Sequence, residues 1–284
     1  MEEKLRPNDY NTSSKPTWCP GCGNYCIWQA LKQALADLEI PSHQLAITYG
    51  IGCAGNMANT IKAYAFHSLH GRALPVALGI KLANHDLTVI AIAGDGDAYG
   101  EGTNHLIHIA RTNPNLTYIV CNNRSYSLTT GQASPTSRKK YVSKTTPWGE
   151  VKSPINPINL LLASNASFVA RGMAGDIQHL TELFKKAIKH KGYAHVDVLQ
   201  HCVTLNKIDT LEYYKKKTYK IEEEKDYDVK DKMKAFEKAE EIKKIPIGIF
   251  YQKRRKPYED SFPQLKKETL VSKNIKATHF RDLI

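Results

Sequence analysis

The sequence lacks any long run of apolar residues. Its two longest runs, residues 87–93 and 116–121, are far shorter than the roughly 20 residues that a helix needs to cross a bilayer. Residues 1–15 are polar and charged, without the apolar segment of a secretory signal. We therefore expect a cytoplasmic chain that has no membrane partner.

Cysteine is sparse, with six residues in 284, and only one Cys-x-x-Cys pair is present. In the cytoplasm such cysteines serve more often as thiolates, metal ligands or buried thiols than as disulfides. The pair, Cys19 and Cys22 in Trp-Cys-Pro-Gly-Cys-Gly-Asn, has a spacing that suits zinc, a redox switch or an iron–sulfur cluster. A zinc ribbon needs two such pairs, so a zinc-ribbon nucleic-acid-binding protein is the weaker alternative.

Acidic residues are fewer than basic ones. The 28 Asp and Glu against 40 Lys and Arg give a formal net charge of +12, which raises the question of nucleic-acid binding. Much of the basic excess lies in the last third of the chain, where residues 215–217 and 253–256 are interleaved with acids such as 222–224. This mixture is typical of a solvated helical face, and we expect no nucleic-acid partner. The alternative is an acidic protein partner that is steered by the positive field.

The apolar pattern predicts alternating strands and helices. The 42% of hydrophobic residues suffice for a buried core, and the β-branched runs read as strands that are covered on both faces. A strand–helix–strand order makes a parallel sheet covered by helices the economical architecture. We expect strands at 45–48, 87–93, 116–121, 166–170 and 195–199, and helices at 24–38, from 56 to about 64, 102–112 and 176–190.

Two stretches interrupt this pattern. Residues 130–157 hold four prolines and many Ser and Thr, and a loop of this length inside a compact unit is usually functional. From about residue 207 the sheet pattern ends and a Lys-rich and Tyr-rich stretch begins. We therefore divide the chain into a domain at 1–206, which carries the chemistry, and a C-terminal extension at 207–284.

Polar side chains follow two of the expected strands. Gly94-Asp95-Gly96-Asp97 ends one strand, and Asn122-Asn123 ends the next along the chain. Open parallel sheets bind ligands at this edge, and glycine lets the backbone approach a phosphate. A carboxylate and an amide oxygen from neighbouring strands are suited to a shared magnesium ion.

These motifs together give the sequence a resemblance to a known family. Gly-Asp-Gly followed by paired Asn is the pattern of the magnesium and diphosphate site of thiamine diphosphate enzymes. Over about residues 15–206 the chain resembles the β subunit of 2-oxoacid:ferredoxin oxidoreductases, of the 2-oxoglutarate or pyruvate synthase type. The motifs occur in that family's order, at residues 18–24, 49–53, 69–75, 94–97 and 128–136. The resemblance implies an α/β thiamine diphosphate-binding fold, a parallel sheet with helices on both faces, and an irregular C-terminal extension.

The resemblance also assigns roles to residues around the coenzyme. For magnesium it implies Asp95, the side chain of Asn123 and the backbone carbonyl of Ser125. Gly96 and Asp97 would face the diphosphate. The thiamine would be lined by Ile51, Gly52, Cys53, Ala54 and His70, and covered by Ser127 and Leu128.

For the cysteines the resemblance implies a [4Fe-4S] cluster held by four thiolates, Cys19, Cys22, Cys53 and Cys202. The segment around Cys202 departs from the family pattern, which more often has Pro or a small residue where this chain has His201. The remaining cysteines are Cys26, one helical turn after Cys22, and Cys121, inside an expected strand; we expect both to be core thiols.

The activity implied is coenzyme A-dependent oxidative decarboxylation of a 2-oxoacid, with electrons passed through thiamine diphosphate and the cluster to ferredoxin. A carboxylate for the aminopyrimidine ring is missing from the chain. The resemblance therefore implies an α subunit that supplies it, in a heterodimer or a dimer of heterodimers, and an isolated chain that is inactive. The alternatives are a thiamine diphosphate-dependent decarboxylase subunit without ferredoxin and a structural partner without catalysis.

On the substrate side we expect His70 and Thr130. Thr130 stands where the family often has Lys or Gly and carries no charge, so Arg72 or the α subunit is the alternative anchor for a distal carboxylate. Between 2-oxoglutarate and pyruvate, the motif at 128–136 favours 2-oxoglutarate.

Overall fold

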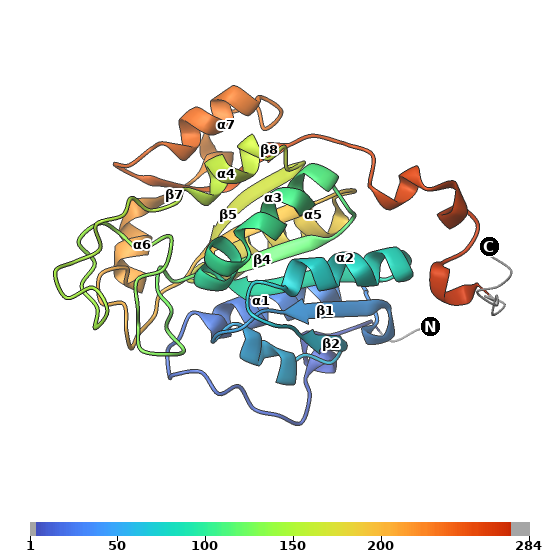
Figure 1. Cartoon of the computed structure of the whole chain (residues 1–284), viewed down its shortest axis with the longest axis horizontal. Coiled ribbons are helices and arrows are strands. Elements are labelled where there is room, and N and C mark those ends of the chain that lie inside the picture. The colour runs from blue at the N-terminus through green and yellow to red at the C-terminus, as the bar shows by residue number, and fades with distance from the viewer. Residues whose placement is uncertain (1–3, 274–284) are drawn as a thin grey trace, which may run out of the picture.

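The computed structural model describes residues 4–273. One eight-stranded sheet has the order β2-β1-β3-β4-β6-β5-β8-β7 (Figure 1). Every neighbouring pair is parallel except β5 with β8. The strands are β1 (Leu45–Tyr49), β2 (Tyr64–His67), β3 (Thr88–Gly94), β4 (Thr117–Asn122), β5 (Phe168–Met173), β6 (Ala194–Leu199), β7 (Thr218–Lys220) and β8 (Ile245–Gln252).

Helices cover both faces of this sheet, as the sequence predicts (Figure 1). They are α1 (Asn24–Asp37), α2 (Ala73–Ala83), α3 (Thr103–Thr112), α4 (Pro157–Ala163), α5 (Ile177–Lys189), α6 (Leu211–Lys217) and α7 (Lys232–Ala239). One core joins α1 and α5 to the sheet, and a second core joins α2, α3, α4 and α7 to its other face.

The strand β3 shows why the central runs are continuously apolar. Ile90 and Ile92 belong to the core under α1 and α5, whereas Val89, Ala91 and Ala93 belong to the core on the other face. Since successive side chains of a strand point to opposite faces, a strand covered on both sides needs apolar residues throughout. The helices instead carry one apolar stripe; in α1, Ile27, Leu31 and Leu35 recur at helical spacing and are fully buried.

The sheet departs from the sequence prediction at both ends. After β1 a short 3-10 turn (Gly55–Asn59) and the edge strand β2 replace the expected helix. The expectation that the sheet pattern ends near residue 207 is wrong, because β8 pairs antiparallel with β5 and carries β7. Helices α2 and α4 were not predicted. No helix within residues 4–273 is both long and apolar enough to span a membrane.

Candidate active site

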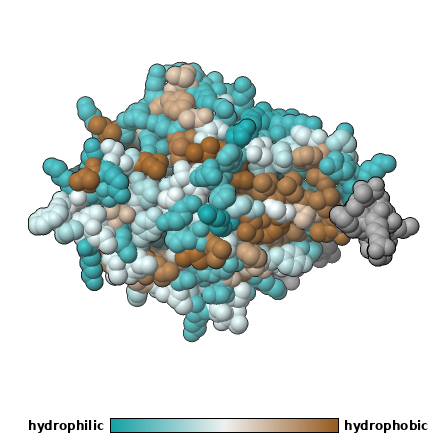
Figure 2. Space-filling view, viewed as in Figure 1, coloured by the Kyte–Doolittle hydropathy of each residue, from teal (hydrophilic) through white to brown (hydrophobic). Residues whose placement is uncertain are grey.

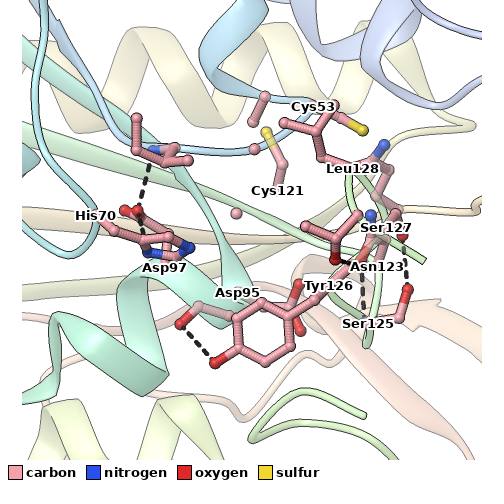
Figure 3. A pocket seen from close by; sticks show the side chains of 17 residues that line it. Cys53, His70, Asp95, Asp97, Cys121, Asn123, Ser125, Tyr126, Ser127 and Leu128 are labelled. Carbon is pink, nitrogen blue, oxygen red and sulfur yellow. Dashed lines mark hydrogen bonds and ion pairs between the residues drawn. The ribbon is translucent and has the colours of Figure 1, made fainter. Parts of the chain in front are cut away.

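The strands β1, β3, β4 and β6 end at one edge of the sheet, and the loops that follow them build a pocket (Figure 3). Every residue that the sequence predicted for magnesium, diphosphate or thiamine lines this one pocket. These are Ile51, Gly52, Cys53, Ala54, His70, Asp95, Gly96, Asp97, Asn123, Ser125, Ser127 and Leu128. Residues that were not predicted join them: Gly94, Cys121, Tyr126, Thr129 and Gln200. Thr130 is exposed and does not line the pocket.

Asp95 is a buried carboxylate that is held by hydroxyl groups. Ser134 Oγ and Thr136 Oγ1 donate to its Oδ2 atom over 2.5 and 2.6 Å. Burial raises the pKa of Asp95 to about 6, and the groups that act against this shift are these hydroxyls and a backbone hydrogen bond, not a lysine or arginine. A buried carboxylate without a protein cation beside it suits a divalent metal ion, so the residues present fit Mg²⁺.

The loop after β4 offers further oxygen atoms to the same pocket. Asn123 and Ser125 are both buried there, and the intervening Arg124 has a left-handed backbone with φ of 57°. The Asn123 side chain accepts a hydrogen bond from the backbone N–H of Ser125 over 3.1 Å. Carboxylate, amide and carbonyl oxygens are hard ligands of the kind that Mg²⁺ takes.

Asp97 ties two loops together. Its Oδ1 atom accepts hydrogen bonds from the backbone N–H groups of Ile51 and Gly71, each over 2.9 Å, and lies 2.9 Å from His70 Nδ1 (Figure 3). The carboxylate is therefore turned toward the loops after β1 and β2. Of the two residues predicted to face a diphosphate, Gly96 offers backbone atoms alone, and the Oδ1 atom of Asp97 is engaged by these loops.

His70 lies beside a second carboxylate that sequence reasoning missed. Its Nδ1 atom is 3.3 Å from Glu101 Oε2, and the Tyr126 hydroxyl donates to Glu101 Oε1 over 3.2 Å. Asp97 and Glu101 are the two ends of a π-helical turn that leads into α3. Such turns are frequent at functional sites, and this one places both carboxylates against one imidazole.

A second cavity adjoins the pocket and is lined by the four cysteines that were predicted to hold a cluster. Cys19 and Cys22 precede α1, Cys53 follows β1, and Cys202 follows β6. All are free thiols. Among the described residues, no three His, Cys, Asp or Glu side chains could hold a single metal ion. Four thiols spread around one cavity fit a [4Fe-4S] cluster, whose iron atoms sit apart, better than one zinc ion.

The cysteine cavity also supplies hydrogen bonds to sulfur. Gln200 Nε2 donates to Cys22 Sγ, and the backbone N–H of Leu205 donates to Cys202 Sγ, each over 3.5 Å. Burial raises the pKa of the Cys202 thiol, but hydrogen bonds from the Ser127 side chain and the backbone of residues 204–206 outweigh it and lower the pKa overall. Hydrogen bonds of this kind support thiolate ligands.

The two remaining cysteines lie outside the cysteine cavity. Cys121 is buried in the core and lines the first pocket, which we call the thiamine-side pocket because it holds the residues predicted for thiamine. Cys26 packs half-buried against the core. The two cavities share part of their walls, namely Cys53, Asn123, Ser127, Leu128 and Gln200.

Two family models match adjoining parts of the chain. Residues 41–198 match the thiamine pyrophosphate enzyme C-terminal TPP-binding domain. Residues 202–267 match the C-terminal part of the pyruvate ferredoxin oxidoreductase β subunit.

Curated relatives and a solved structure extend this likeness. A 2-oxoacid:ferredoxin oxidoreductase subunit β from Saccharolobus solfataricus is 48% identical over 83% of this chain and 81% of its own length. The 2-oxoglutarate oxidoreductase subunit KorB of Mycobacterium tuberculosis is 41% identical over 72% of this chain and 55% of its own. A 2-oxoglutarate:ferredoxin oxidoreductase from Magnetococcus marinus, solved with 2-oxoglutarate, coenzyme A and succinyl-CoA bound, has a TM-score of 0.90 at 38% identity. That match covers 93% of this chain and 91% of the matched chain.

Proposed function

The chain belongs to the family of 2-oxoacid:ferredoxin oxidoreductase β subunits, and from this premise we propose its reaction and its partners. With an α subunit it oxidatively decarboxylates 2-oxoglutarate, coenzyme A receives the acyl group, and the electrons leave through a [4Fe-4S] cluster to ferredoxin. The observation that carries this proposal is the wall shared by the thiamine-side pocket and the four-cysteine cavity, which includes Cys53 and Gln200.

The thiamine pyrophosphate-binding domain supports the first half of the proposed reaction, the decarboxylation of the 2-oxoacid. Bound thiamine diphosphate supplies the carbanion chemistry that removes carbon dioxide from a 2-oxoacid. We assign Asp95, Asn123 and the carbonyl of Ser125 to the magnesium ion that anchors its diphosphate. His70 Nδ1 lies close to Asp97 and Glu101, so Nε2 is the nitrogen that we assign to the substrate side.

The four cysteines support the second half of the proposed reaction, the transfer of electrons to ferredoxin. We assign Cys19, Cys22, Cys53 and Cys202 as ligands of the cluster. Cys53 lines both cavities, so the loop after β1 would line the thiamine and would also supply a ligand to the cluster. The positive charge of the chain favours an acidic electron carrier, because opposite charges steer association.

An α subunit completes the pocket. Asp95 and Asp97 are the carboxylates among the described residues that line it, and both are engaged by other groups. We therefore assign the carboxylate for the aminopyrimidine ring to the α subunit. Helix α2 supports a subunit contact, since apolar side chains gather over it on the face shown in Figure 2, and exposed apolar patches often mark an interface.

The preference for 2-oxoglutarate is supported by the names of the KorB relative and of the solved structure. Thr130 is exposed, two residues beyond Leu128 in the loop after β4. It could therefore contact a substrate only if the α subunit covers this surface. We therefore place the anchor for the distal carboxylate on the α subunit or on Arg72.

The test is co-expression of this chain with its α subunit and anaerobic purification. We expect coenzyme A-dependent dye reduction that is fastest with 2-oxoglutarate in a panel of 2-oxoacids, no activity from the chain alone, and about four iron atoms per chain. Cys19→Ser should lose iron, whereas Cys26→Ser, one helical turn beyond the pair, should keep it. Iron below about half of the expected content in the unsubstituted complex would contradict the proposed cluster and would support the alternative, a thiamine decarboxylase subunit without ferredoxin.

A further inference from the structure

Gln200 occupies the junction of the two cavities. It directly follows β6, its backbone N–H donates to Asn122 O over 2.9 Å, and its side chain is buried, with 1% of the residue exposed. The side chain lines both the thiamine-side pocket and the cysteine cavity. Its Nε2 atom donates to Cys22 Sγ over 3.5 Å.

Packing holds this side chain in place. A Cβ atom on Gly23, the residue after Cys22, would lie 2.7 Å from Gln200 Cγ. The Gln200 side chain therefore packs closely against a position that only glycine can occupy without displacing it. The neighbouring His201 binds the same loop twice, since its ring Nε2 lies 3.0 Å from Gly21 O and its carbonyl accepts from the Gly23 N–H over 3.4 Å. The amide therefore has little freedom to turn away from the sulfur.

The surroundings of Cys22 make this hydrogen bond important. Cys22 is buried, with 9% of the residue exposed, so water does little to stabilise negative charge on its sulfur, and the Gln200 amide donates to that sulfur instead. Reduction of a cluster adds one electron without a proton, so the ligand sulfurs become more negative. An N–H donor to a ligand sulfur therefore stabilises the reduced form more than the oxidised form.

We propose that Gln200 is the positioning residue that raises the reduction potential of the cluster, through its amide hydrogen bond to Cys22, so that the cluster accepts electrons from the thiamine side. This inference rests on the proposed cluster at Cys19, Cys22, Cys53 and Cys202. The inference goes beyond the proposed function by assigning control of the cluster's reduction potential to one side chain that lies between the two cavities.

The experiment is a potentiometric titration of the anaerobically purified α/β complex, followed by the electron paramagnetic resonance signal of the reduced cluster. Gln200→Leu removes the donor at similar volume, and Gly23→Ala displaces the amide without altering it. Gln33→Leu is the matched control, because Gln33 is a glutamine of α1 whose amide binds Asp37 outside both cavities. Iron content and thiamine diphosphate affinity are measured on each variant.

We expect Gln200→Leu and Gly23→Ala to keep iron and thiamine diphosphate but to shift the potential to more negative values, with a smaller fraction of the cluster reduced by substrate. Gln33→Leu should match the unsubstituted complex. An unchanged potential in an iron-loaded Gln200→Leu or Gly23→Ala complex would overturn the proposal. Absence of iron from the unsubstituted complex would instead overturn the proposed function, so the two failures are distinguishable.

Discussion

Single side chains of the long loop complete the predicted magnesium site. The two hydroxyls that hold the Asp95 carboxylate, on Ser134 and Thr136, lie 39 and 41 residues further along the chain. Both donate to Oδ2, so together they fix the orientation of the carboxylate rather than neutralise it. Thr136 Oγ1 also lies 2.9 Å from Asn122 Oδ1, which connects the loop to the end of β4.

We predict that Thr136→Val weakens magnesium-dependent thiamine diphosphate binding. Valine keeps the shape but removes the hydroxyl that orients Asp95, and loss of such a supporting group commonly costs 10–100-fold in metal affinity, about the size of effect expected here. Fluorescence titration of the α/β complex at a series of magnesium concentrations measures it. Thr145→Val, in the exposed part of the same loop, is the control and should have no effect.

Removal of the carboxylate itself should be more severe. We expect Asp95→Ala to abolish turnover of the complex, because the proposed magnesium ion loses its charged ligand. The exposed Asp86 provides the matched control, Asp86→Ala, whose turnover should stay at the level of the unsubstituted complex. Full turnover with Asp95→Ala would show that the chain is a structural partner without catalysis.

At the scale of elements, the loops of the pocket are joined by close backbone contacts that only glycine permits. Gly71 follows His70 and has φ of +71°, and a Cβ atom there would lie 2.5 Å from the backbone carbon of Glu101. The loop after β2 therefore rests directly on the π-helical turn. This contact places His70 against both carboxylates of that turn.

Gly71→Ala should destabilise the chain and displace His70. The left-handed backbone alone costs about 1–3 kcal/mol for a residue with a side chain, and the contact with Glu101 adds to it. Gly79→Ala is the matched control, since its Cβ would meet nothing within 4 Å in α2. There alanine should stabilise by roughly 0.5–1 kcal/mol. Urea unfolding measures both, and equal stability of the two variants would contradict the packing argument.

Strands covered on both faces could be predicted from the sequence, because the middle of β3 and of β4 is a continuous apolar run. Strand β6 was predicted as well, from a shorter apolar pattern that includes His195 and Asp197. Strand β8 could not be predicted: it has a Pro and a Gly, lies among lysines, and its Gly248 has φ of +125° beside an irregular pairing with β5. Strand β2 is only four residues long and exposed throughout, so its short apolar stretch does not distinguish a strand from a helix. Each of these two strands is recognisable only by its neighbour in the sheet.

The same division holds within the site. Motif residues such as Asp95 and Asn123 could be placed in one pocket by the rule that ligands bind at the carboxyl edge of a parallel sheet. Glu101, Tyr126 and Gln200 could not, because each acts through a partner that is distant in sequence. The motif at 128–136 did contain Ser134 and Thr136, but nothing in the sequence says that their hydroxyls meet Asp95.

At the scale of the whole molecule, a chain of buried hydrogen bonds connects the pocket to the centre of the sheet. Beyond Thr136 and Asn122, the Asn122 amide and the Tyr99 hydroxyl both donate to Asp197 Oδ1 over 2.9 Å. Tyr99 OH also lies 2.9 Å from His195 Nε2, and Tyr193 OH lies 2.9 Å from His195 Nδ1. Since the Tyr99 proton is used by Asp197, His195 carries its proton on Nε2 and accepts from Tyr193 at Nδ1.

We expect His195 to make the free energy of unfolding depend on pH in the acid range. His195 is fully buried, and burial lowers its pKa to about 3, so the folded chain keeps it neutral while the unfolded chain binds a proton below its ordinary pKa of 6.5. The contribution of neutral His195 to the free energy of unfolding is fully present above pH 6.5 and is lost as the pH falls toward 3. Between pH 7 and pH 5 the loss should be about 2 kcal/mol.

His195→Gln removes this titration while keeping one donor and one acceptor for the two tyrosines. We expect the variant to be less stable than the unsubstituted chain at pH 7 but to lose about 2 kcal/mol less on going to pH 5, as measured by urea unfolding at each pH. Asp95 and His190, whose pKa values are also shifted by burial, titrate equally in both proteins, so the difference isolates His195. Parallel loss of stability in the two proteins would mean that His195 is protonated in the folded chain, and the direction assigned to the hydrogen-bond chain would then be wrong.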